Sequence, residues 1–287
     1  MPDQLSSILE SNEVQQLATG FLFTEGPLWH TDGYLYFVDI RRSLIFRMRP
    51  GSEPDVLREN SGGSNGLTFD LHGRMVMCEG DARRVTRMEP DGTINVLVEH
   101  WQGKRLNRPN DVVGRSDGSL YFTDPGGRLE PPERELDFAG IFRIAPDGSC
   151  DPVITDFEYP NGLAFSPDER ILYVANTRQK THITAYDVHQ NGSVSNPRIF
   201  ADMTSDEPDG VPDGMKVDMA GNVYCTGPGG CWVFDSSGKH LGIIRLPEIP
   251  ANCAWGGPDR RTLFFTARTS VYSMRMKNAG TPVPRAR

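Results

Sequence analysis

Four polar residues with oxygen-bearing side chains recur at comparable places in the sequence, each near the start of an expected β-strand. They are Glu25, Asn110, Asn161 and Asp213. Two carboxylates and two amides are hard ligands of the kind that Ca²⁺, Mg²⁺ or Mn²⁺ prefer in proteins. No His or Cys occupies an equivalent place, which disfavours a zinc-type site made of nitrogen and sulfur ligands. If the four side chains converge, they can hold one divalent cation.

A structural explanation competes with the chemical one for each of these residues alone. Asn and Asp before Gly are common turn formers, because they tolerate a left-handed backbone. Glu25 has no such turn preference. Four converging positions, one of them a glutamate, favour a metal site over four unrelated turns.

The elements that must bring these residues together are six repeats of one pattern. Each repeat begins with a small turn that contains Asn, Asp or Gly, and continues through a strand, a polar turn and an apolar strand. We call the second polar position of each initial turn the anchor. The anchors are Glu25, Asn65, Asn110, Asn161, Asp213 and Asn252. Successive anchors lie 40, 45, 51, 52 and 39 residues apart, and each interval has the length of one propeller blade.

The strands of each repeat are short and rich in β-branched and aromatic residues. The second strand is exemplified by Tyr34–Val38 and Leu172–Ala175, and the third by Gly140–Ile144, after which a turn leads into a fourth. Four strands, repeated six times, predict an all-β, six-bladed β-propeller with four-stranded antiparallel blades. No composition shift or linker interrupts residues 1–287, so we expect one domain.

Closing such a ring requires a strand from the other end of the chain. The sixth repeat ends soon after its third strand, and a tail with Pro and Arg follows over residues 280–287. Residues 13–20 precede the first anchor and have the pattern of a short extended segment. We expect this segment to complete the last blade, which would also remove the exposed edge of an open sheet. All anchors would then meet at one end of a central channel.

Five motifs occur in order along the chain. They are Glu25-Gly26-Pro27-Leu28-Trp29, Arg105 to Asp111, Tyr121-Phe122-Thr123-Asp124-Pro125, Pro160 to Asp168, and Pro212-Asp213-Gly214-Met215. Together they resemble the SMP-30/gluconolactonase/LRE-like family, also called regucalcin-like, over about residues 14–276. The resemblance implies a six-bladed propeller and a metal-dependent hydrolase. Most members of that family are sugar lactonases, and a related branch hydrolyses organophosphates.

Position by position, the resemblance implies roles for five residues. The family's metal-binding Glu, Asn and Asp fall on Glu25, Asn161 and Asp213. Its substrate-binding Arg and Asn fall on Arg108 and Asn110, which places Asn110 in or next to the metal shell.

These positions lead to a mechanistic hypothesis. One divalent cation would bind the carbonyl oxygen of a lactone and stabilise the oxyanion that forms when water attacks. We expect Ca²⁺ first, with Mg²⁺, Mn²⁺, Zn²⁺ or Fe²⁺ as alternatives. Asp213 would also take the proton of that water, because a carboxylate beside both metal and water is placed for base catalysis. Arg108 and Asn110 would hydrogen-bond the sugar hydroxyl groups and orient the ring.

Two other functions remain open at this stage. The same metal ligands would serve a phosphotriesterase-like hydrolase, although Arg108 would then have a less obvious purpose. A non-enzymatic propeller used as a binding platform would carry polar residues without ligand character at the channel mouth. The pair Glu25 and Asp213 disfavours that platform.

Two features beside the expected site have both a structural and a functional explanation. Asp124 follows a strand, and we favour a role in capping turn amides over a place in the pocket lining. The insertion at residues 126–139 lengthens blade three with Pro and charged residues. It is either a loop that shapes substrate choice or a tolerated surface insertion, and it contains no residue that aligns with the family's further substrate contact.

Charge and composition exclude several classes of protein. The formal net charge of −8, without a basic stripe, argues against a nucleic-acid partner. No stretch approaches the roughly 18 apolar residues of a membrane span, and the N-terminus lacks a signal-peptide pattern. The five cysteines include no CxxC pair, so we expect neither disulfides nor a thiolate zinc site. We expect a cytoplasmic monomer or weak homo-oligomer that acts on a small-molecule lactone.

Overall fold

The computed structural model describes residues 4–126, 129–207 and 209–283. Parts of the predicted insertion (127–128) and of the predicted tail (284–287) lie outside these ranges. The helical elements of the described chain are three short 3₁₀ helices: η1 (Leu5–Ser7), η2 (Ile40–Arg42) and η3 (Pro131–Glu133). No helix in the described ranges has the length and apolar character needed to cross a membrane.

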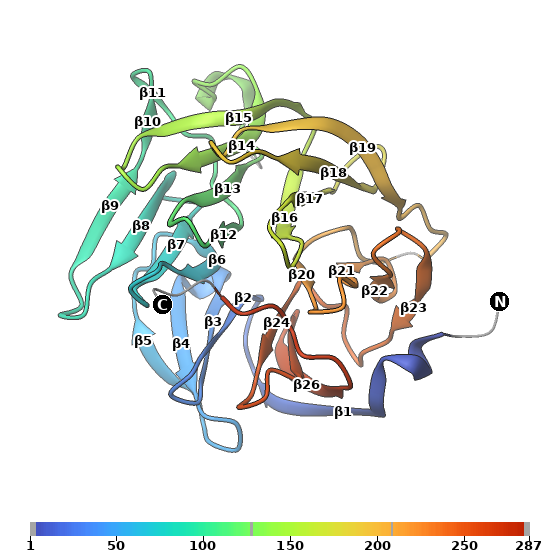
Figure 1. Ribbon diagram of the computed structural model, residues 1–287. Coiled ribbons are helices and arrows are strands. Elements are labelled where there is room, and N and C mark those ends of the chain that lie inside the picture. Colours follow the sequence, from blue (N-terminus) through green and yellow to red (C-terminus); the bar gives the residue numbers. More distant parts are fainter. Residues whose placement is uncertain (1–3, 127–128, 208, 284–287) are drawn as a thin grey trace.

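Six four-stranded antiparallel sheets form a ring around a central channel, and each sheet is one blade of a β-propeller (Figure 1). The first three blades are β2 (Thr24–His30), β3 (Tyr34–Asp39), β4 (Leu44–Met48) and β5 (Asp55–Arg58); β6 (Ser64–Phe69), β7 (Met75–Glu79), β8 (Arg84–Met88) and β9 (Ile94–Val98); and β12 (Val112–Gly114), β13 (Leu120–Asp124), β14 (Ala139–Ile144) and β15 (Cys150–Phe157). The last three are β16 (Pro160–Phe165), β17 (Ile171–Asn176), β18 (His182–Val188) and β19 (Val194–Asp202); β20 (Met215–Val217), β21 (Val223–Gly227), β22 (Gly230–Phe234) and β23 (His240–Ile244); and β24 (Asn252–Gly256), β25 (Thr262–Ala267), β26 (Ser270–Met276) and β1 (Leu9–Thr19). A separate small hairpin pairs β10 (His100–Trp101) with β11 (Lys104–Arg105). The predicted six-bladed propeller is confirmed.

The ring is closed by a strand from the start of the chain. β1 pairs antiparallel with β26, so the outer strand of blade six precedes the first blade in sequence. The prediction of this closing strand is confirmed, but the strand begins at Leu9 and not near residue 13. The early part was missed because residues 10–13 are all exposed and polar, as suits an outer edge, and show no apolar alternation.

Apolar contacts between neighbouring blades hold the ring together. The indole of Trp29 in blade one stacks on Phe264 in blade six, with ring centroids 5.2 Å apart. Trp255 of blade six meets Tyr224 of blade five edge to face at 5.0 Å. The second strands lie between such layers, and every residue of β13 is buried. Because these strands are buried on both faces, their sequences are continuous apolar runs without polar alternation.

Neighbouring inner strands are also joined by backbone hydrogen bonds beside the anchors. The N–H of Gly66 donates to the carbonyl oxygen of Asn110 at 2.7 Å, and that of Gly162 donates to Asp213 at 3.1 Å. A Cβ atom at Gly162 would overlap the carbonyl oxygen of Asp213. Glycine therefore follows the anchor because the next blade approaches too closely for a side chain.

We expect Gly162→Ala to lower the free energy of unfolding by about 1–3 kcal/mol, because the added methyl group forces two blades apart. Gly80→Ala is the matched control. The nearest atom to a Cβ at Gly80 is the carbonyl oxygen of Pro109 at 3.4 Å, an ordinary contact. Urea unfolding of both variants measures the difference, and equal losses would contradict the close approach of the blades.

Candidate metal site at one end of the channel

The six inner strands place the anchors at one end of the channel, which we call the anchor end. Glu25 and Asn161 lie inside β2 and β16, whereas Asn110 and Asp213 lie just before β12 and β20. Glu25 is 2% exposed and Asn161 is 5% exposed, while Asn110 and Asp213 are half-buried. None of the four has a positive φ. A left-handed turn therefore does not explain why these residue types occur there.

Glu25 is held in place by two hydrogen bonds. Its Oε2 accepts the backbone N–H of Gly26 at 2.6 Å and the side-chain amide of Asn252 at 2.9 Å. The Oδ1 of Asn252 in turn accepts the N–H of Cys253 at 2.8 Å. Both ends of the Asn252 amide are thus used, and this sixth anchor orients Glu25.

A third carboxylate, which the sequence reasoning did not select, also lies at the anchor end. Asp111 is 3% exposed, and its Oδ1 accepts the N–H of Val112 at 2.8 Å. It occupies the position after the anchor, where four other blades have glycine, and its side chain covers Gly66 of blade two. That departure from the glycine pattern was the signal in the sequence that could have identified it.

The three carboxylates act on one another through their charges. Burial, and then the charge of Asp111, raises the pKa of Glu25 from an ordinary 4.5 to about 7. Burial, followed by the charges of Glu25 and Asp111, raises the pKa of Asp213 well above its usual range. Burial also raises the pKa of Asp111, and the positive charge of Lys216 on β20 partly opposes this rise. Such crowding of negative charge favours either protonation or a bound cation.

Several oxygen atoms at this end have no hydrogen-bond partner among the described residues. They include Oδ1 of Asn161, Oδ2 of Asp111 and Oδ1 of Asn65. The amide nitrogen of Asn161 donates to the hydroxyl of Thr177 at 3.0 Å, which fixes the side chain and leaves its oxygen free. Buried polar oxygens without partners are uncommon, and a cation would satisfy them.

This donor set fits a hard divalent cation. Within the described ranges, no three side chains of His, Cys, Asp or Glu form a metal-binding group by themselves. A cation at the anchor end would therefore depend on amide oxygens as well as carboxylates. An oxygen-only donor set is the kind that Ca²⁺ and Mg²⁺ accept.

The loop that carries Arg108 is fixed by Asp124. The Oδ2 of Asp124 accepts the N–H of Asn107 at 2.7 Å, and its Oδ1 accepts the N–H of Arg108 at 2.6 Å. The expected capping role of Asp124 is confirmed by these bonds. Burial raises the pKa of Asp124 to about 7, although the two N–H donors and Arg83 oppose the rise. The guanidinium of Arg108, half-buried two residues before Asn110, pairs with the carboxylate of Asp81.

The described part of the predicted insertion packs against this loop. Leu136 is 2% exposed and belongs to the apolar core of blades two and three. The carbonyl oxygen of Phe138 accepts the amide of Asn107 at 2.9 Å, and that of Glu133 accepts Arg83 at 3.1 Å. The insertion is thus more than a loose surface addition, and its influence on substrate choice stays a prediction.

Comparison with known proteins identifies the family of the chain. The model of the family described as "SMP-30/Gluconolactonase/LRE-like region" matches residues 23–269. The chain belongs to this family. The resemblance inferred from the motifs is confirmed, over slightly fewer residues than the 14–276 expected.

Relatives within the SMP-30/gluconolactonase/LRE-like family are similar along most of the chain. A gluconolactonase of Zymomonas mobilis is 32% identical, and the match covers 96% of this chain and 85% of that protein. A pentonolactonase of Haloferax volcanii is 31% identical over 84% of this chain and 80% of its own. The solved structure of a gluconolactonase from Xanthomonas campestris superposes with a TM-score of 0.87 at 34% identity, covering 95% of this chain and 92% of that one.

The raised pKa values predict how the cation-free protein responds to pH. Unfolded Asp and Glu lose their protons near pH 4, whereas Glu25 keeps its proton up to about pH 7 in the folded state. At Glu25 the folded state therefore binds more protons than the unfolded state, so the stabilising contribution of this group is greatest below about pH 4 and is lost as the pH rises to about 7. In the presence of a chelator we expect Glu25 alone to contribute a loss of about 1–3 kcal/mol across this range, against the opposite contribution of carboxylates such as Glu89 and Asp259, whose pKa values are lowered by hydrogen bonds and neighbouring arginines.

Urea unfolding at a series of pH values, with and without Ca²⁺, measures this loss. Glu25→Gln should remove this contribution, so its stability relative to the wild type should rise between pH 4 and 7, and exposed Glu53→Gln is the control that should show no such rise. If, in the presence of a chelator, the stability of Glu25→Gln changed between pH 4 and 7 by the same amount as that of the wild type and of Glu53→Gln, the assignment would be contradicted.

Proposed function

We propose that this chain hydrolyses a sugar lactone with one divalent cation bound at the anchor end. The observation that carries the proposal is the convergence of three carboxylates and an unpaired amide oxygen, from different blades, at one end of the channel. Relatives that match most of the chain are named gluconolactonase and pentonolactonase, which supports hydrolysis of a cyclic ester as the reaction class.

Glu25, Asn161 and Asp213 would hold the cation, with Asn110 in or beside the same shell. When bound, the cation would polarise the lactone carbonyl and stabilise negative charge on its oxygen. Ca²⁺ is our first choice because the available donors are all oxygen atoms, and Mg²⁺, Mn²⁺, Zn²⁺ and Fe²⁺ are the alternatives to compare.

Asp213 is the residue that we propose takes a proton from the attacking water. Water can reach it because it is only half-buried, and its pKa is raised by burial and then by the charges of Glu25 and Asp111. A base works best when its pKa is near the working pH, and crowding moves this carboxylate in that direction. Asp111 would add negative charge that acts on Glu25 and Asp213, while Asn252 fixes the orientation of Glu25.

Arg108 and Asn110 would orient the substrate by hydrogen bonds to sugar hydroxyl groups. Asp124 supports this role, because its two bonds to the backbone fix the loop from which the Arg108 side chain projects. The guanidinium offers several donors in a fixed plane, which suits neighbouring hydroxyl oxygens.

The other two functions have less support. The relatives described above are named as lactonases, which favours a lactone over a phosphotriester. A binding platform would not require buried carboxylates whose charges oppose one another, because such a cluster is costly unless a cation or a proton neutralises it.

Chelation tests the cation requirement. We expect the protein to release acid from sugar lactones in a pH-stat assay, to stop after treatment with a chelator, and to recover when a divalent cation is restored. The panel contains sugar lactones and aliphatic lactones, with Ca²⁺, Mg²⁺, Mn²⁺, Zn²⁺ and Fe²⁺ added back separately. No chelator-sensitive acid release from any lactone would refute the proposal.

Asp213→Asn tests the assignment of the base. With the cation at saturation, we expect kcat to fall by about 10²- to 10⁴-fold, the usual contribution of general-base catalysis. Asp209→Asn, an exposed carboxylate four residues earlier, is the matched control and should keep its activity. Calorimetric titration with Ca²⁺ separates weakened cation binding from a slower chemical step, and full turnover at saturation would show that Asp213 is not the base.

A further inference from the structure

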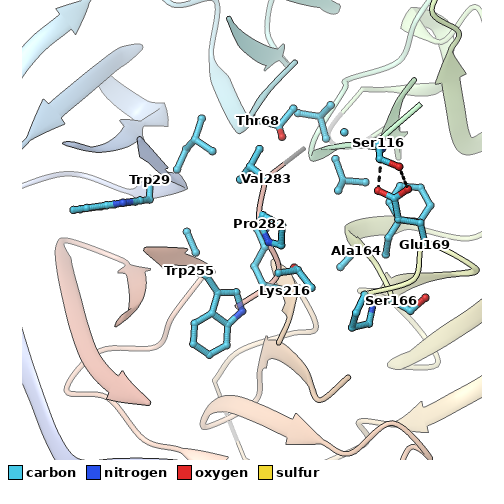
Figure 2. Close-up of a pocket in the computed structure, with 18 of the residues that line it drawn as sticks. Trp29, Thr68, Ser116, Ala164, Ser166, Glu169, Lys216, Trp255, Pro282 and Val283 are labelled. Atoms are coloured by element: carbon cyan, nitrogen blue, oxygen red, sulfur yellow. Dashed lines mark hydrogen bonds between the residues drawn. The ribbon is translucent and has the colours of Figure 1, made fainter. Parts of the chain in front are cut away.

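A cavity lies at the end of the channel opposite to the anchors. It has a volume of about 580 Å³ and is lined by the far ends of the inner strands, including Trp29, Lys216 and Trp255 (Figure 2). None of the predicted metal or substrate residues lines it. Its volume is typical of small-molecule sites, which measure roughly 300–1,000 Å³.

One wall of this cavity is formed by the segment after the last strand. The N–H of Gly280 donates to the carbonyl oxygen of Arg260 at 2.8 Å, and the N–H and hydroxyl of Thr281 donate to Val217 at 3.1 and 3.0 Å. A Cβ at Gly280 would overlap the indole of Trp255, so the segment lies flat against that ring. One side of the cavity is thus a segment held in place by hydrogen bonds.

The acceptors in the cavity wall are already used by the chain. The carboxylate of Glu169 accepts the backbone N–H of Ser116 at 2.9 Å and also its hydroxyl (Figure 2). Asp168, at the rim, accepts the hydroxyl of Ser166 at 2.6 Å. Most other lining residues are apolar: Leu28, Leu67, Val112, Ala164, Phe165 and Ala254.

Two donors in the same wall have unused capacity. The indole nitrogen of Trp255 has no hydrogen-bond partner among the described residues, although this side chain is 6% exposed. The ammonium of Lys216 donates to the carbonyl oxygen of Met215 at 2.9 Å and forms no ion pair within the described ranges, which leaves two of its three N–H groups. Figure 2 shows the indole nitrogen on the side of its ring that faces Lys216 and Pro282.

We infer that this cavity binds a small molecule with a carboxylate on an apolar body. The carboxylate accepts hydrogen bonds from Lys216 and Trp255, and the apolar body lies between the aliphatic walls. A buried N–H without a partner is costly, and an acceptor from a ligand removes that cost. A cationic ligand would leave both donors unsatisfied and would meet carboxylates that are already paired. None of the residues proposed to bind the cation or the lactone lines this cavity, although the charge of Lys216 also acts on Asp111 at the anchor end.

Calorimetry with 2-naphthoate and 2-naphthamide tests the inference directly. The two probes share one apolar body and differ in the negative charge, and a chelator present throughout prevents any cation from holding the carboxylate. We expect 2-naphthoate to bind at least about tenfold more tightly, as charge-assisted hydrogen bonds exceed neutral ones. This comparison needs no variant, and it remains informative whether or not the chain proves to be a lactonase.

Variants then locate the probe. Lys216→Met should weaken 2-naphthoate at least about tenfold and remove the preference over the amide, and Trp255→Phe should weaken it severalfold. Exposed Lys239→Met and anchor-end Arg108→Met are the matched controls and should bind as the wild type does. Equal affinity for the two probes, no binding of 2-naphthoate at millimolar concentration, or a loss in Arg108→Met instead of Lys216→Met would overturn the inference.

Discussion

The close approach of neighbouring inner strands is the constraint on which the rest of this structure depends. Between blades two and three, four and five, and five and six, the N–H of Gly66, Gly162 or Gly214 donates to a backbone carbonyl at the start of the next inner strand, and these contacts have no room for a side chain. The anchors of adjacent blades are thereby fixed side by side. Because the contact involves only backbone atoms, it sets the radius of the channel while leaving the anchor side chains free to differ from blade to blade.

Crowded negative charge is a consequence of that radius. Glu25, Asp111 and Asp213 come from blades one, three and five, yet each lies close enough to another to affect its pKa. A rigid ring of sheets keeps the carboxylates together despite their repulsion. The nearby amides have different tasks, since Asn252 orients a carboxylate and Asn161 leaves an oxygen unpaired. Lys216, from the middle of the channel, moderates the charge at one end and lines a cavity at the other.

Much of this arrangement could be predicted from the sequence. The spacing of the anchors predicted the number and length of the blades. The short sixth repeat indicated that residues before the first anchor supply the closing strand. Asp111 was missed because it stands after the anchor, at a position that four other blades fill with glycine. The different hydrogen bonding of Asn65, Asn161 and Asn252 could not be predicted. The three side chains are chemically identical, and their roles depend on which groups lie next to them in the folded chain. The cavity opposite to the anchors could not be predicted either. It combines the ends of six inner strands with residues 281–283, which the sequence indicated only as part of a C-terminal tail.

The pairing of β1 with β26 has a consequence for the order of assembly. Gln16 bonds to Ser270, a partner 254 residues later in the chain. At a synthesis rate of about 5–20 residues per second, the first strand waits roughly 10–50 s on the ribosome before its partner exists. During that time an outer edge made of polar, exposed residues is an advantage, because it has little tendency to pair with the wrong strand. Residues 10–13 made the beginning of β1 hard to predict because they are polar. The same polarity reduces wrong strand pairing until β26 has been synthesised and the ring can close.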